Sequence, residues 1–104
     1  KVGEAVAAGD FDKGILVCGS GTGMAIAANK VPGIRAAVAW NEEIARLSRQ
    51  HNNANVLSLA GRFIPEAEQA KIVKAWLETD FEGGRHATRV EKIEQIEKED
   101  LEQK

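Results

Sequence analysis

The hydrophobic and polar positions of this chain alternate between short apolar runs and longer stretches of helical character. The apolar runs at 14–18, 35–40 and 55–60 have the length of strands, and residues 15–17 suit a strand buried on both faces. Apolar residues at helical spacing, or an excess of helix formers, predict helices over 1–8, 24–29, 41–50, 65–77 and from residue 85 onward. A polar loop is expected over 51–54. The last helix carries Val90, Ile93 and Ile96 on an apolar stripe.

Strands that alternate with helices predict a parallel sheet joined by right-handed crossovers. We therefore expect an α/β fold with a three-layer, Rossmann-like parallel sheet and flanking helices, formed by residues 1–104 as one domain. In such sheets, ligands bind at the carboxyl ends of the strands. Cys18, Asn41 and the pair Gly61-Arg62 fall at predicted strand ends, and Asn41 suits the N-cap of the helix that follows.

Composition narrows the classes of partner. The 104 residues carry a net charge of -2, with 43% hydrophobic and 29% charged residues, which fits a soluble globular protein. The chain has no block of basic residues, so nucleic acid is not expected as a partner. Its apolar runs are shorter than the roughly 20 residues of a membrane helix, so no membrane association is expected. A single cysteine favours a reducing compartment, the cytoplasm.

The segment 14–30 joins a strand, three alternating glycines and an Ala-rich helix. Gly19, Gly21 and Gly23 let backbone N–H groups approach a ligand closely, and the start of a helix favours an anion. The loop is not a P-loop, because no Gly-Lys-Ser/Thr follows, and its third glycine comes too early for the dinucleotide fingerprint. Glu42 and Glu43 lie where a ribose-binding acid would sit, but favourable charge at a helix start explains them as well. A plain glycine turn is the remaining alternative.

Two side chains are candidates for proton transfer. Cys18 closes the first strand just before the glycines, where N–H groups and a helix start favour a thiolate that can act as a base toward a carbon acid. A buried core thiol is the alternative. His51 lies in the predicted polar loop, where an imidazole either transfers protons near neutral pH or is simply solvated.

Arginines supply the candidate anion site. Arg85 and Arg89 are four residues apart near the start of the last helix, so they share one of its faces. Two guanidiniums on one face suit a phosphate, and a pair of surface charges is the alternative. Arg49 is expected to be a solvated helix charge, and His86 a surface residue. The expected core includes Met24, Trp40 and Trp76.

Five segments then combine into a recognisable set: 18–24 (Cys-Gly-Ser-Gly-Thr-Gly-Met), 27–30 (Ala-Ala-Asn-Lys), 48–52 (Ser-Arg-Gln-His-Asn), 82–86 (Glu-Gly-Gly-Arg-His) and 89–90 (Arg-Val). In this order they strongly resemble the ribose-5-phosphate isomerase B family, which includes the galactose-6-phosphate isomerase subunits. The resemblance covers essentially the whole chain. It implies an aldose–ketose isomerase that interconverts ribose 5-phosphate and ribulose 5-phosphate through an enediolate, without metal or organic cofactor. The alternatives are a galactose-6-phosphate isomerase subunit and a non-catalytic phosphosugar-binding module.

The resemblance also implies a role for each matching residue. Cys18 is the base that moves a proton between C1 and C2, and His51 opens the sugar ring. Arg85 and Arg89 hold the phosphate, with Arg62 as a third member. Asn52 binds substrate beside His51, and Ser20 contacts the sugar. The loop whose backbone donors hold the enediolate consists of Gly19, Ser20, Gly21, Thr22 and Gly23.

The family's site lies between two subunits, so the resemblance implies a homodimer or a dimer of dimers that takes a phosphorylated sugar. A chain of this size buries a modest core, which an oligomer interface would supplement. The family also begins with a strand that ends in an Asp-His pair, and nothing in this chain matches it. We therefore expect the chain to be the C-terminal portion of a larger domain, without the first strand or strands of the family fold.

Overall fold

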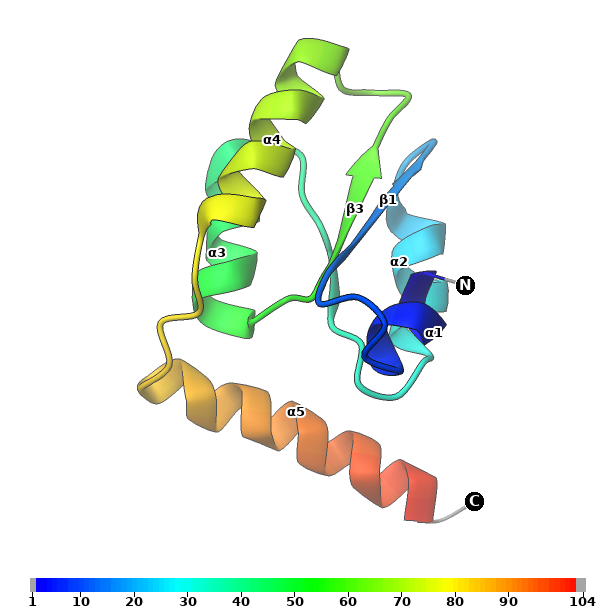
Figure 1. The fold of residues 1–104 in the computed structure, drawn as a ribbon, viewed down its shortest axis with the longest axis vertical. Coiled ribbons are helices and arrows are strands. Elements are labelled where there is room, and N and C mark those ends of the chain that lie inside the picture. The colour runs from blue at the N-terminus through cyan, green and yellow to red at the C-terminus, as the bar shows by residue number, and fades with distance from the viewer. Residues whose placement is uncertain (1, 103–104) are drawn as a thin grey trace.

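The structure, a computed structural model, describes residues 2–102, in which helices alternate with strands (Figure 1). The strands are β1 (Gly14–Cys18), β2 (Ala36–Val38) and β3 (Val56–Ala60). The helices are α1 (Val2–Ala7), α2 (Thr22–Asn29), α3 (Glu42–Asn52), α4 (Glu66–Glu78) and α5 (Arg85–Glu102). The predicted alternation of strands and helices is confirmed.

The three strands form one parallel sheet in the order β1-β3-β2. Gly14 pairs with Val56 at one end of the sheet, and Cys18 pairs with Ala60 at the other. On the other side of β3, Ala36 pairs with Val56 as well. All three strands therefore end at the same edge, which we call the carboxyl edge, and begin at the opposite amino edge. The prediction of a parallel sheet is correct.

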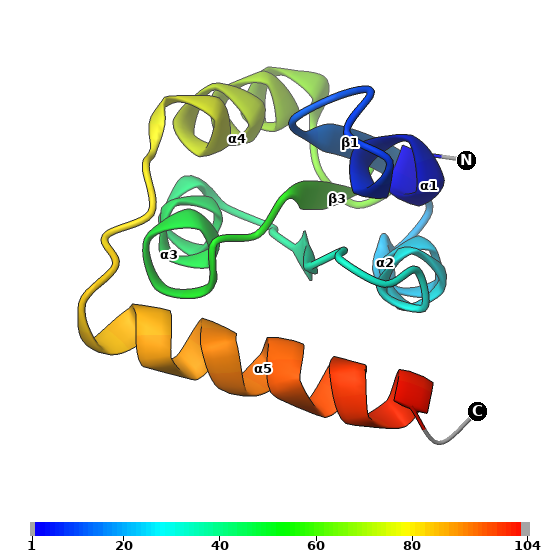
Figure 2. The same ribbon diagram turned by 60° about the horizontal axis from the view of Figure 1, so that its bottom comes forward.

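Helices cover both faces of this sheet, and α5 crosses its amino edge (Figure 2). On one face, α1 and α2 enclose a cluster that contains Val6, Leu16, Ala28, Ile34 and Val56. On the other face, α3 and α4 enclose Ala39, Ala45, Leu57, Leu59, Ile72 and Trp76. The central strand β3 is buried along its whole length, so the two clusters meet through it. Each large side chain buried in this way contributes roughly 1.5–3 kcal/mol to folding.

Strand β1 departs from the sequence-based prediction of burial on both faces. Leu16 is buried under α1 and α2, but Ile15 is 36% exposed and Val17 is 58% exposed. The cause is its position, because β1 is an edge strand and α4 packs over β3 rather than over β1. An apolar run therefore does not by itself distinguish a central strand from an edge strand whose second face is bare.

Of the three residues expected in the core, Trp76 is fully buried, whereas Met24 and Trp40 are 44% and 60% exposed. The prediction for Met24 and Trp40 is therefore wrong. Met24 is on the outer side of α2, and Trp40 follows the buried Ala39 after β2 has ended. Apolar character near a strand end or a helix start thus did not identify core positions here.

Helix α3 runs two residues beyond its predicted end. Asn41 caps its start, because the Asn41 side-chain oxygen accepts the Ile44 N–H at 2.8 Å. Asn53 ends it in the left-handed conformation with φ 48°, and the Asn53 N–H donates to the Arg49 carbonyl. His51 and the next residue therefore lie in the last helical turn and not in a loop, which corrects the prediction.

Candidate active site

Cys18 ends β1 at the carboxyl edge and is partly exposed, with a free thiol. The alternative of a buried core thiol therefore does not hold. The thiol borders an open pocket of about 570 Å³ at this edge. The pocket is lined by Val17, Cys18, Gly19, Gly61, Arg62, Ile64, Pro65, Glu66 and Gln69. A strand end, a sulfur and an arginine thus share one concave surface.

The glycine loop after Cys18 is held against the central strand. Gly21 has a left-handed backbone with φ 81°, and a Cβ at this position would lie 3.1 Å from the carbonyl carbon of Leu59. The buried Ser58 hydroxyl donates to the Gly21 carbonyl at 2.6 Å. Only glycine accommodates both the backbone angle and the close approach to β3. The loop is therefore more than an ordinary turn, because its position is fixed by the core.

The same loop opens α2 and faces an arginine. Gly21 is the N-cap of α2 and provides no side-chain cap, and the Thr22 N–H contacts the Ser20 hydroxyl oxygen at 3.4 Å. A Cβ on Gly19 would lie 3.8 Å from the guanidinium carbon of Arg62. Uncapped N–H groups at a helix start, together with a guanidinium, form a surface suited to negative charge.

A second group of candidate residues lies where α3 ends and α5 begins. His51, in the last turn of α3, stacks on His86 of α5 with ring centroids 4.1 Å apart and an angle of 12° between the planes. Arg85 and Arg89 are both exposed on the first turns of α5. His86 is only 4% exposed, so its prediction as a surface residue is wrong.

Burial and neighbouring charge act together on His86. Burial lowers the pKa of His86, and the adjacent His51, Arg89 and Arg85 lower it further, while Glu82 opposes the shift. The buried Nδ1 atom of His86 has no hydrogen-bond partner among residues 2–102. Burial and neighbouring positive charge therefore both favour the neutral form of the His86 imidazole, which stacks on the His51 ring. Sequence reasoning missed it, although its place between the two arginines was a usable signal.

Arg49 corrects another prediction, because it is 7% exposed rather than solvated. Its guanidinium donates to the Thr79 carbonyl at 3.1 Å, the Ala54 carbonyl at 2.6 Å and the Asn53 side-chain oxygen at 2.9 Å. Burial lowers the pKa of Arg49 from its usual value. The side chain ties the ends of α3 and α4 to the start of β3, and so fixes the helical turn that carries His51.

The two groups of candidate residues lie at opposite edges of the sheet. Cys18, the glycine loop and Arg62 follow strands at the carboxyl edge, where the Gly61 N–H donates to the Cys18 carbonyl. Helix α3 returns to the amino edge, where the Asn55 N–H donates to the Arg35 carbonyl just before β2. The residues at the amino edge are His51, Asn52, Arg85 and Arg89. Within one chain, the structure does not bring Cys18 and His51 together.

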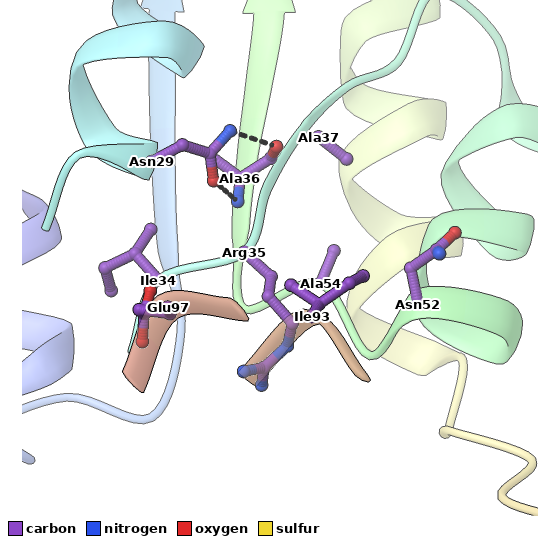
Figure 3. Close-up of a pocket in the computed structure, with 9 residues that line it drawn as sticks. All are labelled: Asn29, Ile34, Arg35, Ala36, Ala37, Asn52, Ala54, Ile93 and Glu97. Atoms are coloured by element: carbon purple, nitrogen blue, oxygen red, sulfur yellow. Dashed lines mark hydrogen bonds between the residues drawn. The ribbon is translucent and has the colours of Figure 1, made fainter. Parts of the chain in front are cut away.

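A further pocket of about 390 Å³ lies between the amino edge and α5 (Figure 3). It is lined by Asn29, Ile34, Arg35, Ala36, Ala37, Asn52, Ala54, Ile93 and Glu97. The Asn29 amide exchanges two hydrogen bonds with the Ala36 backbone on its wall (Figure 3). Of the candidate site residues only Asn52 contributes to this pocket, so it is not where the proton-transfer groups gather.

Glu42 lies at the start of α3, with its carboxylate 3.0 Å from the Arg46 guanidinium. Glu42 therefore has a partner on its own helix, as expected of an acidic residue at a helix start. Among residues 2–102, no cluster of three or more His, Cys, Asp or Glu side chains is placed to hold a metal ion. In the same part of the chain, no helix combines the length and apolar character that crossing a membrane requires.

Comparison with known proteins gives a consistent match. A family model described as Ribose/Galactose Isomerase matches residues 1–93. The chain is 52% identical over 97 residues to Ribose-5-phosphate isomerase B of Escherichia coli (strain K12). The matched region covers 93% of this chain and 65% of that protein. The match extends over nearly all of the present chain but not over the whole relative.

Solved structures agree with the sequence match. The chain is similar to Ribose-5-Phosphate Isomerase B of Clostridium thermocellum, with a TM-score of 0.92 and 56% identity over 94% of this chain and 66% of that one. It is also similar to Ribose-5-phosphate Isomerase B of Mycoplasma genitalium with bound ribulose-5-phosphate. The TM-score is 0.90, and the identity is 49% over 94% of this chain and 65% of that one. The chain thus spans 65–66% of the length of these three proteins.

Proposed function

The chain belongs to the ribose/galactose isomerase family, and on that premise we propose that the protein interconverts ribose 5-phosphate and ribulose 5-phosphate. Two similar proteins are named ribose-5-phosphate isomerase B, and one of these was solved with ribulose-5-phosphate bound. The observation that carries the proposal is the partly exposed Cys18 beside a glycine loop fixed against β3, with the Arg62 guanidinium next to it.

In the proposed reaction, the Cys18 thiolate removes the proton from C2 of the open-chain aldose, giving an enediolate. The same proton returns to C1, while the hydroxyl proton on O2 moves to O1, so the sugar gains and loses nothing overall. Backbone N–H groups at the start of α2 stabilise the negative oxygen of the enediolate, in the role that an oxyanion hole has in acyl-transfer enzymes.

The amino-edge residues supply the other two tasks. His51 opens the sugar ring, because an imidazole exchanges protons near neutral pH. Arg85 and Arg89, exposed on one face of α5, hold the phosphate, with Arg62 as a third guanidinium. Asn52 binds the sugar beside His51, and Ser20 contacts it from the glycine loop.

We further propose that a complete site forms from two chains. The carboxyl-edge and amino-edge groups are at opposite ends of β3, so one phosphosugar does not reach both within a single chain. A second copy that brings its amino edge to the carboxyl edge of the first would complete the set, as in a homodimer or a dimer of dimers. The exposed Ile93 and Ile96 on α5, which are 42% and 67% exposed, supply apolar surface for such an interface.

The test is Cys18→Ala in the full-length protein. We expect loss of isomerisation of ribose 5-phosphate, with binding of the sugar phosphate largely retained in calorimetry. Cys18→Ser is the matched control for size, and it should also fail because a hydroxyl is a poor base. Normal turnover by Cys18→Ala would refute the proposal.

Two other outcomes point to the alternatives. Faster turnover of galactose 6-phosphate than of ribose 5-phosphate would favour a galactose-6-phosphate isomerase subunit, which the description of the matching family model also covers. A wild-type protein that binds ribose 5-phosphate without turning it over would favour a non-catalytic phosphosugar-binding module.

A further inference from the structure

His86 is a buried polar group that the proposed reaction does not use. It is 4% exposed, and its Nδ1 atom lacks a hydrogen-bond partner among residues 2–102. A buried nitrogen without a partner costs free energy, so we look for a contact of the His86 ring that offsets this cost. Its ring stacks on that of His51 in a nearly parallel arrangement, with centroids 4.1 Å apart.

The His51 ring, in turn, is held mainly by this stack in the part of the chain that the structure describes. Histidines that transfer protons are usually oriented by a hydrogen bond from the second ring nitrogen to a carboxylate or carbonyl. Among residues 2–102, no hydrogen bond to the His51 side chain is present, and the stack with His86 is its aromatic contact. The orientation of the His51 ring therefore depends on the neighbouring helix α5.

We propose that His86 is a positioning residue for His51, and that the stack between the two rings holds the His51 imidazole in the orientation that sugar-ring opening requires. The inference rests on the proposed function of His51. Arg49 fixes the backbone of the last turn of α3. His86 fixes the ring that this turn carries.

Burial and the surrounding charges act on the protonation of His86. Burial and the positive neighbours His51, Arg89 and Arg85 lower the pKa of His86, and Glu82, in the loop before α5, is the group that opposes them. Burial and these charges together therefore favour the neutral form of the His86 ring.

Ring opening moves one proton from the anomeric hydroxyl to the ring oxygen, as the bond between C1 and the ring oxygen breaks and the C1 carbonyl forms. An imidazole speeds this transfer only when its nitrogen is within hydrogen-bond reach of the sugar. A ring free to rotate about its side-chain bonds spends most of its time out of reach. A displacement of about 1 Å can cost on the order of 100-fold in rate.

The experiment isolates ring opening from isomerisation. In the Cys18→Ala background of the full-length protein, exchange between the α and β anomers of 1-¹³C ribose 5-phosphate is followed by NMR. His86→Leu keeps the apolar volume without a planar ring, whereas His86→Phe keeps a ring that can stack. We expect His86→Leu to slow enzyme-dependent anomer exchange about 10- to 100-fold, and His86→Phe to stay within about threefold of the parent.

The same two substitutions in the wild-type background should separate kcat from KM. His86→Leu should lower kcat for ribose 5-phosphate with little change in KM, because Arg85 and Arg89 still bind the phosphate. Melting temperatures of both variants show whether each remains folded.

Three results would overturn the inference: unchanged anomer exchange in His86→Leu, equal losses in the Leu and Phe variants, or no enzyme-dependent exchange in the Cys18→Ala parent. Failure of the proposed function looks different, because Cys18→Ala would then isomerise normally or the wild type would not isomerise at all. Enzyme-dependent anomer exchange that responds to His86 would support the inference in either case.

Discussion

The division of the candidate site between two edges of the sheet leads to a complementation experiment. One variant, Cys18→Ala, loses the proposed base at the carboxyl edge. The other, Arg85→Ala combined with Arg89→Ala, loses the proposed phosphate clamp at the amino edge. Each variant alone should be inactive or nearly so, since every site that it forms lacks one essential group.

The expected magnitude follows from the dimensions of the sheet. The four residue steps from Val56 to Ala60 measure about 3.3 Å each, so the two ends of β3 are about 13 Å apart. His51 belongs to the last turn of α3, on the side of the Val56 end. An extended ribose 5-phosphate measures about 8 Å from C1 to phosphorus, from six single bonds of about 1.5 Å. The backbone ends of β3 are therefore farther apart than the sugar is long, and under the proposed function the two groups of residues come from two chains.

Mixing the two variants tests this reasoning. Random pairing of equal amounts makes about half of the dimers mixed, and each mixed dimer has one intact site of two, so about a quarter of wild-type activity should return. The assay is ribose 5-phosphate isomerisation after joint refolding, with differently tagged chains to measure the mixed fraction. A mixture of Cys18→Ala with Cys18→Ser is the negative control. Mixed dimers present in the expected amount but without activity would refute the two-chain site.

Three further changes test the fold and its electrostatics. Gly21→Ala should lower the free energy of unfolding by about 1–3 kcal/mol in a urea titration, because φ is 81° and the new Cβ would lie 3.1 Å from the backbone of β3. In the matched control Gly23→Ala, the new Cβ meets nothing within 4 Å, so the free energy of unfolding should not fall. Trp76→Ala should cost about 3–5 kcal/mol because the ring is fully buried, but Trp40→Ala, at a 60% exposed position, should stay within about 0.5 kcal/mol. The pKa of folded His86 lies below its unfolded value of 6.5, so the native state binds fewer protons, and the melting temperature should fall as pH drops below 6.5, less steeply in His86→Phe. Equal losses within either matched pair, or the same pH slope in His86→Phe, would contradict these explanations.

The order of strands and helices and the parallel sheet could be predicted from local patterns. Alternating apolar runs and helical spacing are properties of neighbouring residues, and they correctly indicated the strand that ends at Cys18 and the N-cap at Asn41. The bare face of β1 could not be predicted in this way. Ile15 and Val17 are as apolar as buried residues, and their exposure depends on where α4 packs.

Burial of charged and polar side chains was the weakest part of the prediction. Arg49 and His86 looked like surface residues because their sequence neighbours are polar. Arg49 is buried because three acceptors from separate elements converge on it, and His86 because α5 packs its first turns against α3. Neither cause is visible in the local sequence.

The sequence predicted a set of site residues and a site between two subunits, but not which residues lie at which edge of the sheet. The rule that ligands bind after parallel strands correctly grouped Cys18 and Arg62 at one pocket. That rule does not cover residues at the carboxyl ends of the crossover helices, such as His51, which lie at the amino edge of the sheet. The catalytic roles of these residues stay predictions until the variants are assayed.

The unpaired side of β1 has a consequence for handling the protein. Among residues 2–102, β1 pairs with β3 alone, so along its outer side the backbone is a template for strand addition, next to the exposed Ile15 and Val17. Such a border promotes self-association whenever no other strand occupies it. At the high concentrations used for NMR or crystallisation, two copies of the chain should therefore be prone to pair edge to edge through β1, and self-association would then originate at this strand rather than at the Cys18 thiol.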